Sequence, residues 1–439
     1  MNLAPRLAHR TPFFYGWAIL FSAGASIFVR NAAASLTIAV FVYPLSDELG
    51  WSRTMIAGAA SLGGLAATFT SPIIGWLVDR FGARMVLTSS VLILGFSTIS
   101  LAWATSTISI FGAAIPWAFY LAYGMGRVIF SSPIQIGASV VVSRWFIRMR
   151  GRVNGILSLT HSVGMVLFPL IASLVIAQSG WRDAWFVLGV MVWVIALLPV
   201  SLLMAQRPED VGLHPDGDES EAVAYESSQQ EEEPAWTLKE AMKTPALWIL
   251  AVGTGLLFLI QAGTNTHAAA FFRDQGLTAT TAGLGISLNA AFLGIGGIVW
   301  GRIVENIPAR YVMAAVGLVM AVGSALFITT DTTIEALAYS ALFGFGLGGM
   351  LTIPPVAYAD YFGRQSLGAI RGITEPFTTF GQAIGVLVPG VVFDYLTTPG
   401  EESYLPAFGA FAALGLFTTL IILMAVPPRK SPLPEDSQG

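Results

Sequence analysis

Arg30 and Arg127 lie in the middle of two long hydrophobic segments, where charged side chains are unusual. An arginine at the centre of a bilayer costs at least about 2.5 kcal/mol, so it normally faces a cavity or a pathway. Its guanidinium can hold a carboxylate through two parallel hydrogen bonds. We therefore predict that both arginines belong to a binding site for a small organic anion. The alternative is a structural role, in which each arginine bonds to a buried acid or to helix-end carbonyls.

Glu375 and His161 are titratable side chains within hydrophobic segments, and both are candidates for proton coupling. Glu375 follows Arg371 by one helical turn, so the two can simply form an i, i+4 pair. A buried carboxyl can instead bind and release a proton, which would couple anion entry to a proton gradient. Histidine titrates near neutral pH, so His161 can exchange protons or donate to a substrate carboxylate. It can also be a hydrogen-bonded structural residue.

Four amide side chains also fall where exposure to lipid would be costly: Asn31, Gln261, Asn265 and Asn289. Amides can orient a substrate in a cavity, and they can equally bond one helix to another. We include all four in the predicted substrate site.

The sequence contains none of the common hydrolase or nucleotide-binding motifs. HExxH, GxSxG and Walker A patterns are absent despite 46 glycines, so we predict no catalytic residues. The chain has no cysteine, which excludes disulfides and thiolate metal sites, and we predict neither a metal nor a cofactor. Its net charge of -4 gives no basic face for nucleic acid, so no nucleic-acid partner is expected.

Composition indicates that lipid surrounds most of the chain. Of 439 residues, 55% are hydrophobic and 11% are charged, whereas soluble domains carry roughly a quarter charged residues. Twelve hydrophobic runs reach the about 20 residues that a spanning helix needs. The runs begin near Phe14, Met55, Met85, Ile108, Val153, Trp185, Leu247, Ala279, Tyr311, Ile334, Leu367 and Leu405. We predict an all-α integral membrane protein with twelve transmembrane helices.

An internal repeat divides these helices into two halves. Gly50, Gly75, Asp79, Ala83 and Arg84 match Gly276, Gly301, Glu305, Ala309 and Arg310 at one constant spacing. Pro133 matches Pro354 and Pro355, which predicts helix breaks at equivalent positions. Duplicated halves are typical of secondary transporters, which rock one half against the other. We expect six-helix bundles at residues 1–204 and 245–428, joined by an acidic linker at 205–244 and followed by a tail at 429–439.

Basic residues predict the orientation. With the N-terminus in the cytoplasm, seventeen Lys and Arg residues fall in cytoplasmic segments and three in the opposite loops. This asymmetry follows the positive-inside rule and fits an even number of spans. We therefore expect a multi-pass protein of the cell inner membrane, with both termini cytoplasmic.

The segment from Gly75 to Arg84 reads GWLVDRFGAR, and it resembles the cytoplasmic signature of the major facilitator superfamily. Residues 301–310 are a weaker copy of it. The resemblance implies the two-bundle fold and a gate on the cytoplasmic side. We assign that gate to Asp79, Arg80, Arg84, Glu305 and Arg310. The alternative is that the arginines only set topology and that Asp79 only offsets their charge.

A narrower resemblance comes from the segment that runs from Trp145 to Gly155, with sequence WFIRMRGRVNG. It is similar to the helix 4–5 signature of the monocarboxylate transporter family, whose bacterial members include oxalate/formate-type antiporters. Residues 207–217, RPEDVGLHPDG, resemble the linker of those members. The helix from Ala279 to Trp300 contains no charge, so the family's substrate-binding arginine has no counterpart there.

These observations predict a secondary active transporter of a small mono- or dicarboxylate that works by alternating access. Proton symport and anion exchange are both open, and protons are a possible coupling ion. A multidrug or neutral-solute exporter of the same superfamily is the alternative, and a membrane sensor is a further one. We expect the protein to function as a monomer in the lipid bilayer.

Overall fold

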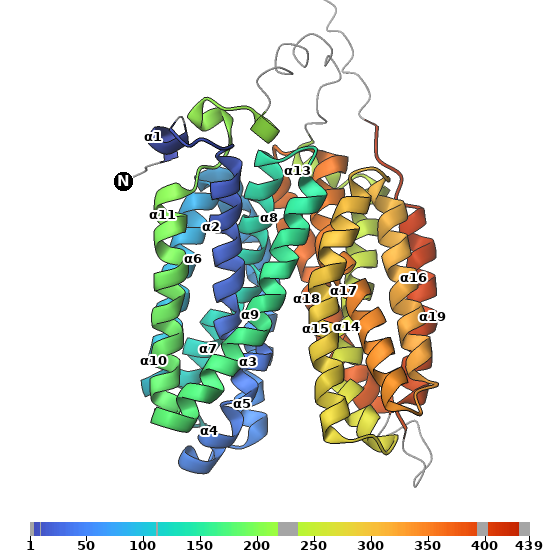
Figure 1. The fold of residues 1–439 in the computed structure, drawn as a ribbon. Coiled ribbons are helices and arrows are strands. Elements are labelled where there is room, and N and C mark those ends of the chain that lie inside the picture. The colour runs from blue at the N-terminus through green and yellow to red at the C-terminus, as the bar shows by residue number, and fades with distance from the viewer. Residues whose placement is uncertain (1–3, 9, 111–112, 218–235, 393–402, 430–439) are drawn as a thin grey trace, which may run out of the picture.

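The computed structural model describes residues 4–8, 10–110, 113–217, 236–392 and 403–429. The described chain is dominated by long helices that run side by side in two bundles, one formed by the first half of the chain and one by the second (Figure 1). Eleven helical segments in these residues are long and apolar enough to cross a membrane. The twelfth, α18 (Leu367–Val391), is long enough but carries Arg371 and Glu375. The predicted twelve-helix all-α fold is confirmed.

The first bundle consists of α2 (Gly16–Val29), the 3-10 turn η1 (Arg30–Ala33), α3 (Ser35–Ala39), α4 (Val42–Leu49), α5 (Arg53–Phe81), α6 (Ala83–Ser100), η2 (Leu101–Trp103), α7 (Trp117–Ser131), α8 (Pro133–Trp145), α9 (Arg150–Ser179), α10 (Trp181–Val192), the π-helical turn η3 (Trp193–Leu197) and α11 (Leu198–Leu203). The second bundle consists of α14 (Pro245–Asp274), α15 (Ala279–Val304), α16 (Ala309–Phe327), α17 (Thr333–Phe362), α18 and α19 (Leu405–Leu423). Short elements outside the bundles are α1 (Ala4–Ala8), β1 (Ile108–Ile110), β2 (Ala113–Ile115), η4 (Glu209–Val211), η5 (Pro215–Gly217) and α13 (Leu238–Ala241).

The repeat is visible in matching turns that start α5 and α15. Gly50 and Gly276 occupy equivalent positions and both have positive φ, at 66° and 79°. This conformation is accessible to glycine at little cost. Two residues later, the side chains of Ser52 and Thr278 each cap their helix by accepting a backbone N–H. The same local sequence therefore produces the same turn and helix start in both bundles.

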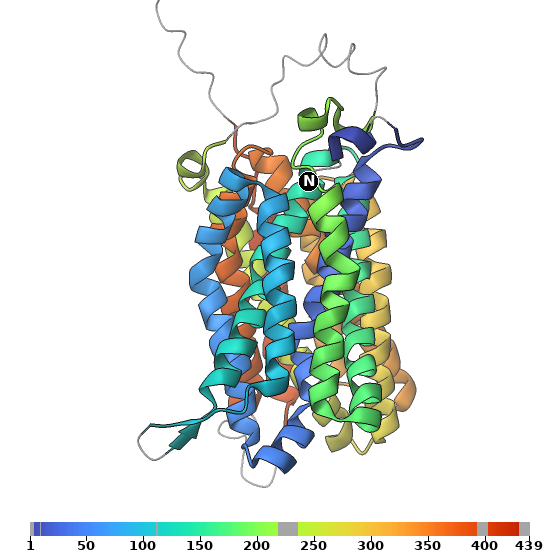
Figure 2. The same ribbon diagram turned by 90° about the vertical axis from the view of Figure 1, so that its left-hand side faces the viewer.

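Two sequence predictions about helix boundaries are wrong. The hydrophobic run near Ile108 begins with an antiparallel β1–β2 hairpin, which Figure 2 shows at one end of the bundle, and the helix starts only at Trp117. At Pro133 the predicted break is present, because α7 ends at Ser131 and α8 starts anew. At the matching position, however, α17 continues through Pro354 and Pro355 without interruption.

The first part of the linker is in contact with both bundles. At its start, the Asp216 carboxylate accepts the backbone N–H groups of Ile147 and Arg148, at 3.0 and 2.9 Å. The guanidinium of Arg364, on the second bundle, donates to Glu209 at 3.3 Å. We call the end of the bundles where these residues lie the linker end. The acidic run at residues 231–233 lies outside the described residues.

The two bundles meet through α5 against α18 and through α9 against α15. Glycines occur at both contacts and let the backbones approach closely. A Cβ on Gly75 would collide with the carbonyl of Gly368, and one on Gly151 would collide with the carbonyl of Gly301. Gly75 and Gly301 are equivalent positions of the repeat, so the two halves use equivalent glycines for close helix packing on the two sides of the interface.

Candidate functional site

Arg30 is the first residue of the 3-10 turn η1, directly after α2, and it is only 6% exposed. One terminal nitrogen of the guanidinium donates to the Phe130 carbonyl at 3.2 Å and to the side-chain oxygen of Gln135. The other lies 3.4 Å from Nδ1 of His161. Phe130 and Gln135 belong to α7 and α8, so the break at Pro133 brings two anchors to the same arginine.

Arg127 approaches the same place from α7. Its guanidinium donates to the carbonyl of Ala33 at 3.4 Å. The guanidinium carbons of Arg30 and Arg127 lie 4.6 and 4.8 Å from the centre of the Phe130 ring. Both cations are therefore attracted to the same aromatic ring.

Neither arginine forms an ion pair with an Asp or Glu within the described ranges. The Nε atoms of Arg30 and Arg127 are both buried without a hydrogen-bond partner. Helix-end carbonyls do bond them, as the structural alternative requires, but the buried acid of that alternative is not found. A buried charge without a counter-ion is costly, so the arrangement retains a capacity to bind an anion.

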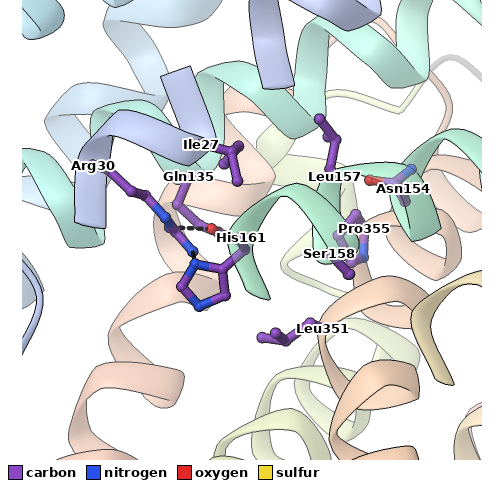
Figure 3. A pocket seen from close by; sticks show the side chains of 9 residues that line it. All are labelled: Ile27, Arg30, Gln135, Asn154, Leu157, Ser158, His161, Leu351 and Pro355. Atoms are coloured by element: carbon purple, nitrogen blue, oxygen red, sulfur yellow. Dashed lines mark hydrogen bonds between the residues drawn. The ribbon is translucent and has the colours of Figure 1, made fainter. Parts of the chain in front are cut away.

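A small pocket beside Arg30 lies between the two bundles (Figure 3). It is lined by Ile27, Arg30, Gln135, Asn154, Leu157, Ser158, His161, Leu351 and Pro355. The last two belong to α17 of the second bundle, and the others belong to the first. The cavity volume is about 30 Å³, enough for only one or two waters. In this conformation the pocket is too small for an organic anion, so the bundles must move for one to bind there.

His161 and Asn31 are packed next to Arg30. The Asn31 side-chain nitrogen lies 3.4 Å from Nδ1 of His161 and donates to the carbonyls of Ile27 and Phe28, at 3.2 and 3.1 Å. Nδ1 thus faces an amide N–H and a guanidinium N–H, both of which are donors. We assign Nδ1 as the acceptor, which places the imidazole proton on Nε2 and leaves the ring neutral in this state.

Glu375 and Arg371 form the i, i+4 pair on α18 that the sequence allows, at 3.1 Å. Both side chains are buried, and the Thr378 hydroxyl also donates to Glu375 at 3.1 Å. The structural pairing is therefore formed.

The three amides of the second bundle lie outside the Arg30 pocket. Asn289 on α15 donates to the carbonyl of Ser340 on α17 at 3.4 Å, which joins two helices of one bundle. The side-chain oxygen of Gln261 is buried without a partner, and Asn265 is half-buried on the same helix. The structure thus groups Asn31 and His161 with Arg30 and places Gln261, Asn265 and Asn289 elsewhere.

Asp79 connects the two bundles at the linker end. Its carboxylate accepts from Arg144 at 2.7 Å and from the backbone N–H groups of Gly368 and Ala369, at 3.1 and 2.7 Å. Those N–H groups belong to the first turn of α18, where a negative charge is favoured by the helix dipole. Asp79 therefore bonds α5 to α8 and α18 at once.

Glu305 is the repeat counterpart of Asp79, and it bonds from the second bundle to the first. Its carboxylate accepts from Nε of Arg152 at 2.8 Å and from the Arg152 backbone N–H at 3.0 Å. Nearby, Arg150 reaches Asp360 on α17 at 2.9 Å. Arg144, Arg150 and Arg152 were not predicted from the sequence as gate residues; Arg150 and Arg152 lie in the Trp145–Gly155 segment that carries the narrower family resemblance.

The remaining predicted gate residues make contacts inside their own bundle. Arg84 donates to the carbonyl of Ser201 at 2.6 Å, and the exposed Arg80 stacks against Trp76. Arg310 donates to the hydroxyl of its neighbour Tyr311 at 2.7 Å.

The bonds between the two bundles that the structure resolves lie between the linker end and the pocket. The innermost of them joins the hydroxyls of Ser158 and Thr352, 2.8 Å apart. Ser158 also lines the pocket, so the contacts close the interface from the pocket to the linker end. This state is closed at the linker end.

Two bundles of spanning helices that pack around a central charged pocket are the architecture of membrane carriers. The sequence profile of the Major Facilitator Superfamily matches residues 17–278 and 250–439. The chain belongs to the Major Facilitator Superfamily and is a multi-pass membrane protein.

Relatives of this chain include carriers and sensors. It is 24% identical over 403 residues to the oxalate:formate antiporter of Oxalobacter formigenes, a match that covers 89% of this chain and 88% of the relative. It is also 24% identical to the membrane sensor protein UhpC of Salmonella typhimurium, over 71% of this chain and 70% of the relative. The fold is similar to that of the proton:xylose symporter XylE, with a TM-score of 0.74, 12% identity, and coverage of 93% and 95% of the two chains.

Proposed function

We propose that this carrier moves a small organic anion, a mono- or dicarboxylate, by alternating access between its two bundles. The observation that carries the proposal is the pair Arg30 and Arg127, which share the Phe130 ring and form no ion pair with an acid in the described residues. A carboxylate would supply the missing negative charge and bidentate acceptors. The likeness to an oxalate:formate antiporter supports an anion of this class.

Coupling by proton symport or by anion exchange fits the groups around the site. His161 contacts Arg30, and Glu375 is a buried carboxylate of the opposite bundle. A proton taken up by either group would change the charge that faces the anion. In anion exchange, a second anion would change that charge instead of a proton.

The two bundles are the parts that move. Residues 1–204 and 245–428 are the two bodies, joined by the linker at 205–244 and followed by the tail at 429–439. The excess of basic residues supports a cytoplasmic position for the linker end and both termini, in a cell whose inner membrane holds the protein. The present state then faces outward, with a monomer as the functional unit.

Uptake of radiolabelled carboxylates by proteoliposomes tests the proposal, with and without a pH gradient and with and without a trapped counter-anion. We expect saturable uptake, stimulated by an inward proton gradient for symport or by the trapped anion for exchange. Absence of uptake across straight-chain mono- and dicarboxylates of up to six carbons would contradict the proposal. Carboxylate binding without any transport would indicate a sensor, and transport of apolar or cationic solutes alone would indicate an exporter.

A further inference from the structure

Both arginines of the site are held by neutral groups. Arg30 is bonded by the Phe130 carbonyl and the Gln135 amide oxygen, and Arg127 is bonded by the Ala33 carbonyl. The Phe130 ring contacts both without carrying a charge. These anchors fix where the guanidiniums lie and leave their positive charges uncompensated.

Of these anchors, Gln135 is the one that a charged side chain of the same shape could replace. Glutamate has the same shape as glutamine, and its oxygen would accept the same bond from Arg30 with a full opposite charge. The chain uses this option on α18, where Glu375 holds the buried Arg371 at 3.1 Å. At Arg30 an amide stands in the equivalent role, which stabilises the cation less and keeps it available.

We propose that Gln135 is a specificity-determining residue that positions Arg30 through a neutral oxygen and so reserves the arginine's charge for the transported anion. The inference rests on the proposed function, because it gives the reserved charge its partner. It extends that function by assigning anion selectivity to a residue that does not itself carry a charge. Gln135 also lines the pocket, so it is accessible from the space in which the anion would bind.

The test replaces Gln135 in the purified full-length protein. Gln135→Glu keeps the side-chain shape and places a negative charge against Arg30, whereas Gln135→Met removes the acceptor without adding charge. Thermal melting, without ligand and with each of the straight-chain mono- and dicarboxylates of up to six carbons, measures stability and affinity on the same samples. Gln382→Glu is the matched control, since it places the same charge on a half-buried glutamine of α18.

We expect stability and affinity to move in opposite directions in Gln135→Glu. The ligand-free protein should melt at or above the wild-type temperature, because the new carboxylate neutralises Arg30, while its affinity for the carboxylates should fall at least about tenfold. Gln135→Met should melt lower and lose only about threefold in affinity, as expected for one hydrogen bond. Gln382→Glu should retain wild-type affinity.

The possible results separate the inference from the proposed function. If Gln135→Glu binds the carboxylates as well as the wild type does, or loses stability and affinity together, the selectivity role of Gln135 is refuted and the carrier assignment stands. If the wild-type protein responds to none of the carboxylates, the proposed function fails, and the role of Gln135 fails with it.

Discussion

Arg144, Arg150 and Arg371 are buried arginines with an acidic partner, whereas Arg30 is buried with none among the described residues. The first three therefore belong to structural ion pairs, of which Arg150–Asp360 also joins the two bundles. Arg30 instead has an amide, a carbonyl, an aromatic ring and an imidazole around it. This contrast between residues of one type is what distinguishes a binding site from a structural ion pair here.

Loss of either unpaired arginine should weaken anion binding more than it weakens the fold. We expect Arg30→Gln and Arg127→Gln each to lower carboxylate affinity by about 10- to 100-fold, since a hydrogen bond to a charged group contributes about 1.5–3 kcal/mol. Arg127→Lys should retain part of the affinity, because it keeps the charge but not the planar fork. Binding titrations and proteoliposome uptake measure both effects. Unchanged transport in both glutamine variants would refute the site.

Glu375 offers a test of coupling at the same scale. In Glu375→Gln the amide oxygen can still accept from Arg371 and the amide N–H can donate to the Thr378 hydroxyl, but the side chain can no longer take up a proton. We expect uptake to lose its response to an imposed pH gradient while counter-anion exchange persists. The measurement is uptake at several internal and external pH values. If the gradient response is retained and only the melting temperature falls, Glu375 has the structural role alone.

At the scale of elements, the first part of the linker connects pieces that must separate. Asp216 bonds to the backbone just before α9, and Glu209 bonds to Arg364, which also donates to the carbonyl of Arg144 at 3.1 Å. The segment from η4 to η5 therefore rests on both bundles at the closed end. Opening of this end would have to break some of these bonds.

Release of the linker should favour opening at its end of the bundles. Asp216→Ala removes both bonds to the backbone before α9, and we expect the inward-open state to gain population about fivefold, as loss of roughly 1 kcal/mol predicts. Spin labels on the linker-end tips of α5 and α17 would report the change as a longer distance. Asp210→Ala is a suitable control, since the Asp210 carboxylate accepts from Arg207 within the linker. Identical distance distributions in Asp216→Ala and the wild type would contradict the expectation.

At the scale of the whole molecule, two pseudo-symmetric bundles surround an asymmetric site. The gate acids Asp79 and Glu305 are equivalent in the repeat, and each bonds to the opposite bundle. The two arginines, by contrast, both belong to the first bundle. We therefore propose that the duplicated parts serve the motion that the bundles share and that the unduplicated ones serve recognition.

A cross-link at the centre of the interface should arrest that motion. The Ser158 and Thr352 hydroxyls are 2.8 Å apart, and the natural chain has no cysteine to interfere. A disulfide requires Cβ atoms about 3.8 Å apart. We expect the double variant Ser158→Cys, Thr352→Cys to form one and to lose transport until a reductant is added. The single variants should stay active under both conditions. Full transport by the oxidised, cross-linked protein would show that this contact does not open.

The sequence determined the properties that depend on local chemistry. Hydrophobic runs predicted the spans, and α15, α18 and α19 begin at the predicted Ala279, Leu367 and Leu405. The fourth span was predicted to begin near Ile108, but its helix begins at Trp117, because an apolar run can form a β-hairpin as well as a helix. The unusual charges were also visible, because a charge in lipid is costly in any fold.

Only the tertiary structure decided which groups face those charges. Gln135 lies 105 residues from Arg30, and Thr352 lies 194 residues from Ser158, so no local pattern could have paired them. Arg144 lies 65 residues from Asp79 and became its partner for the same reason, whereas the N–H groups of Gly368 and Ala369 reach Asp79 only because α18 of the second bundle packs against α5. Hydropathy is a property of each segment by itself, whereas a partner is chosen by the contact geometry of several helices at once.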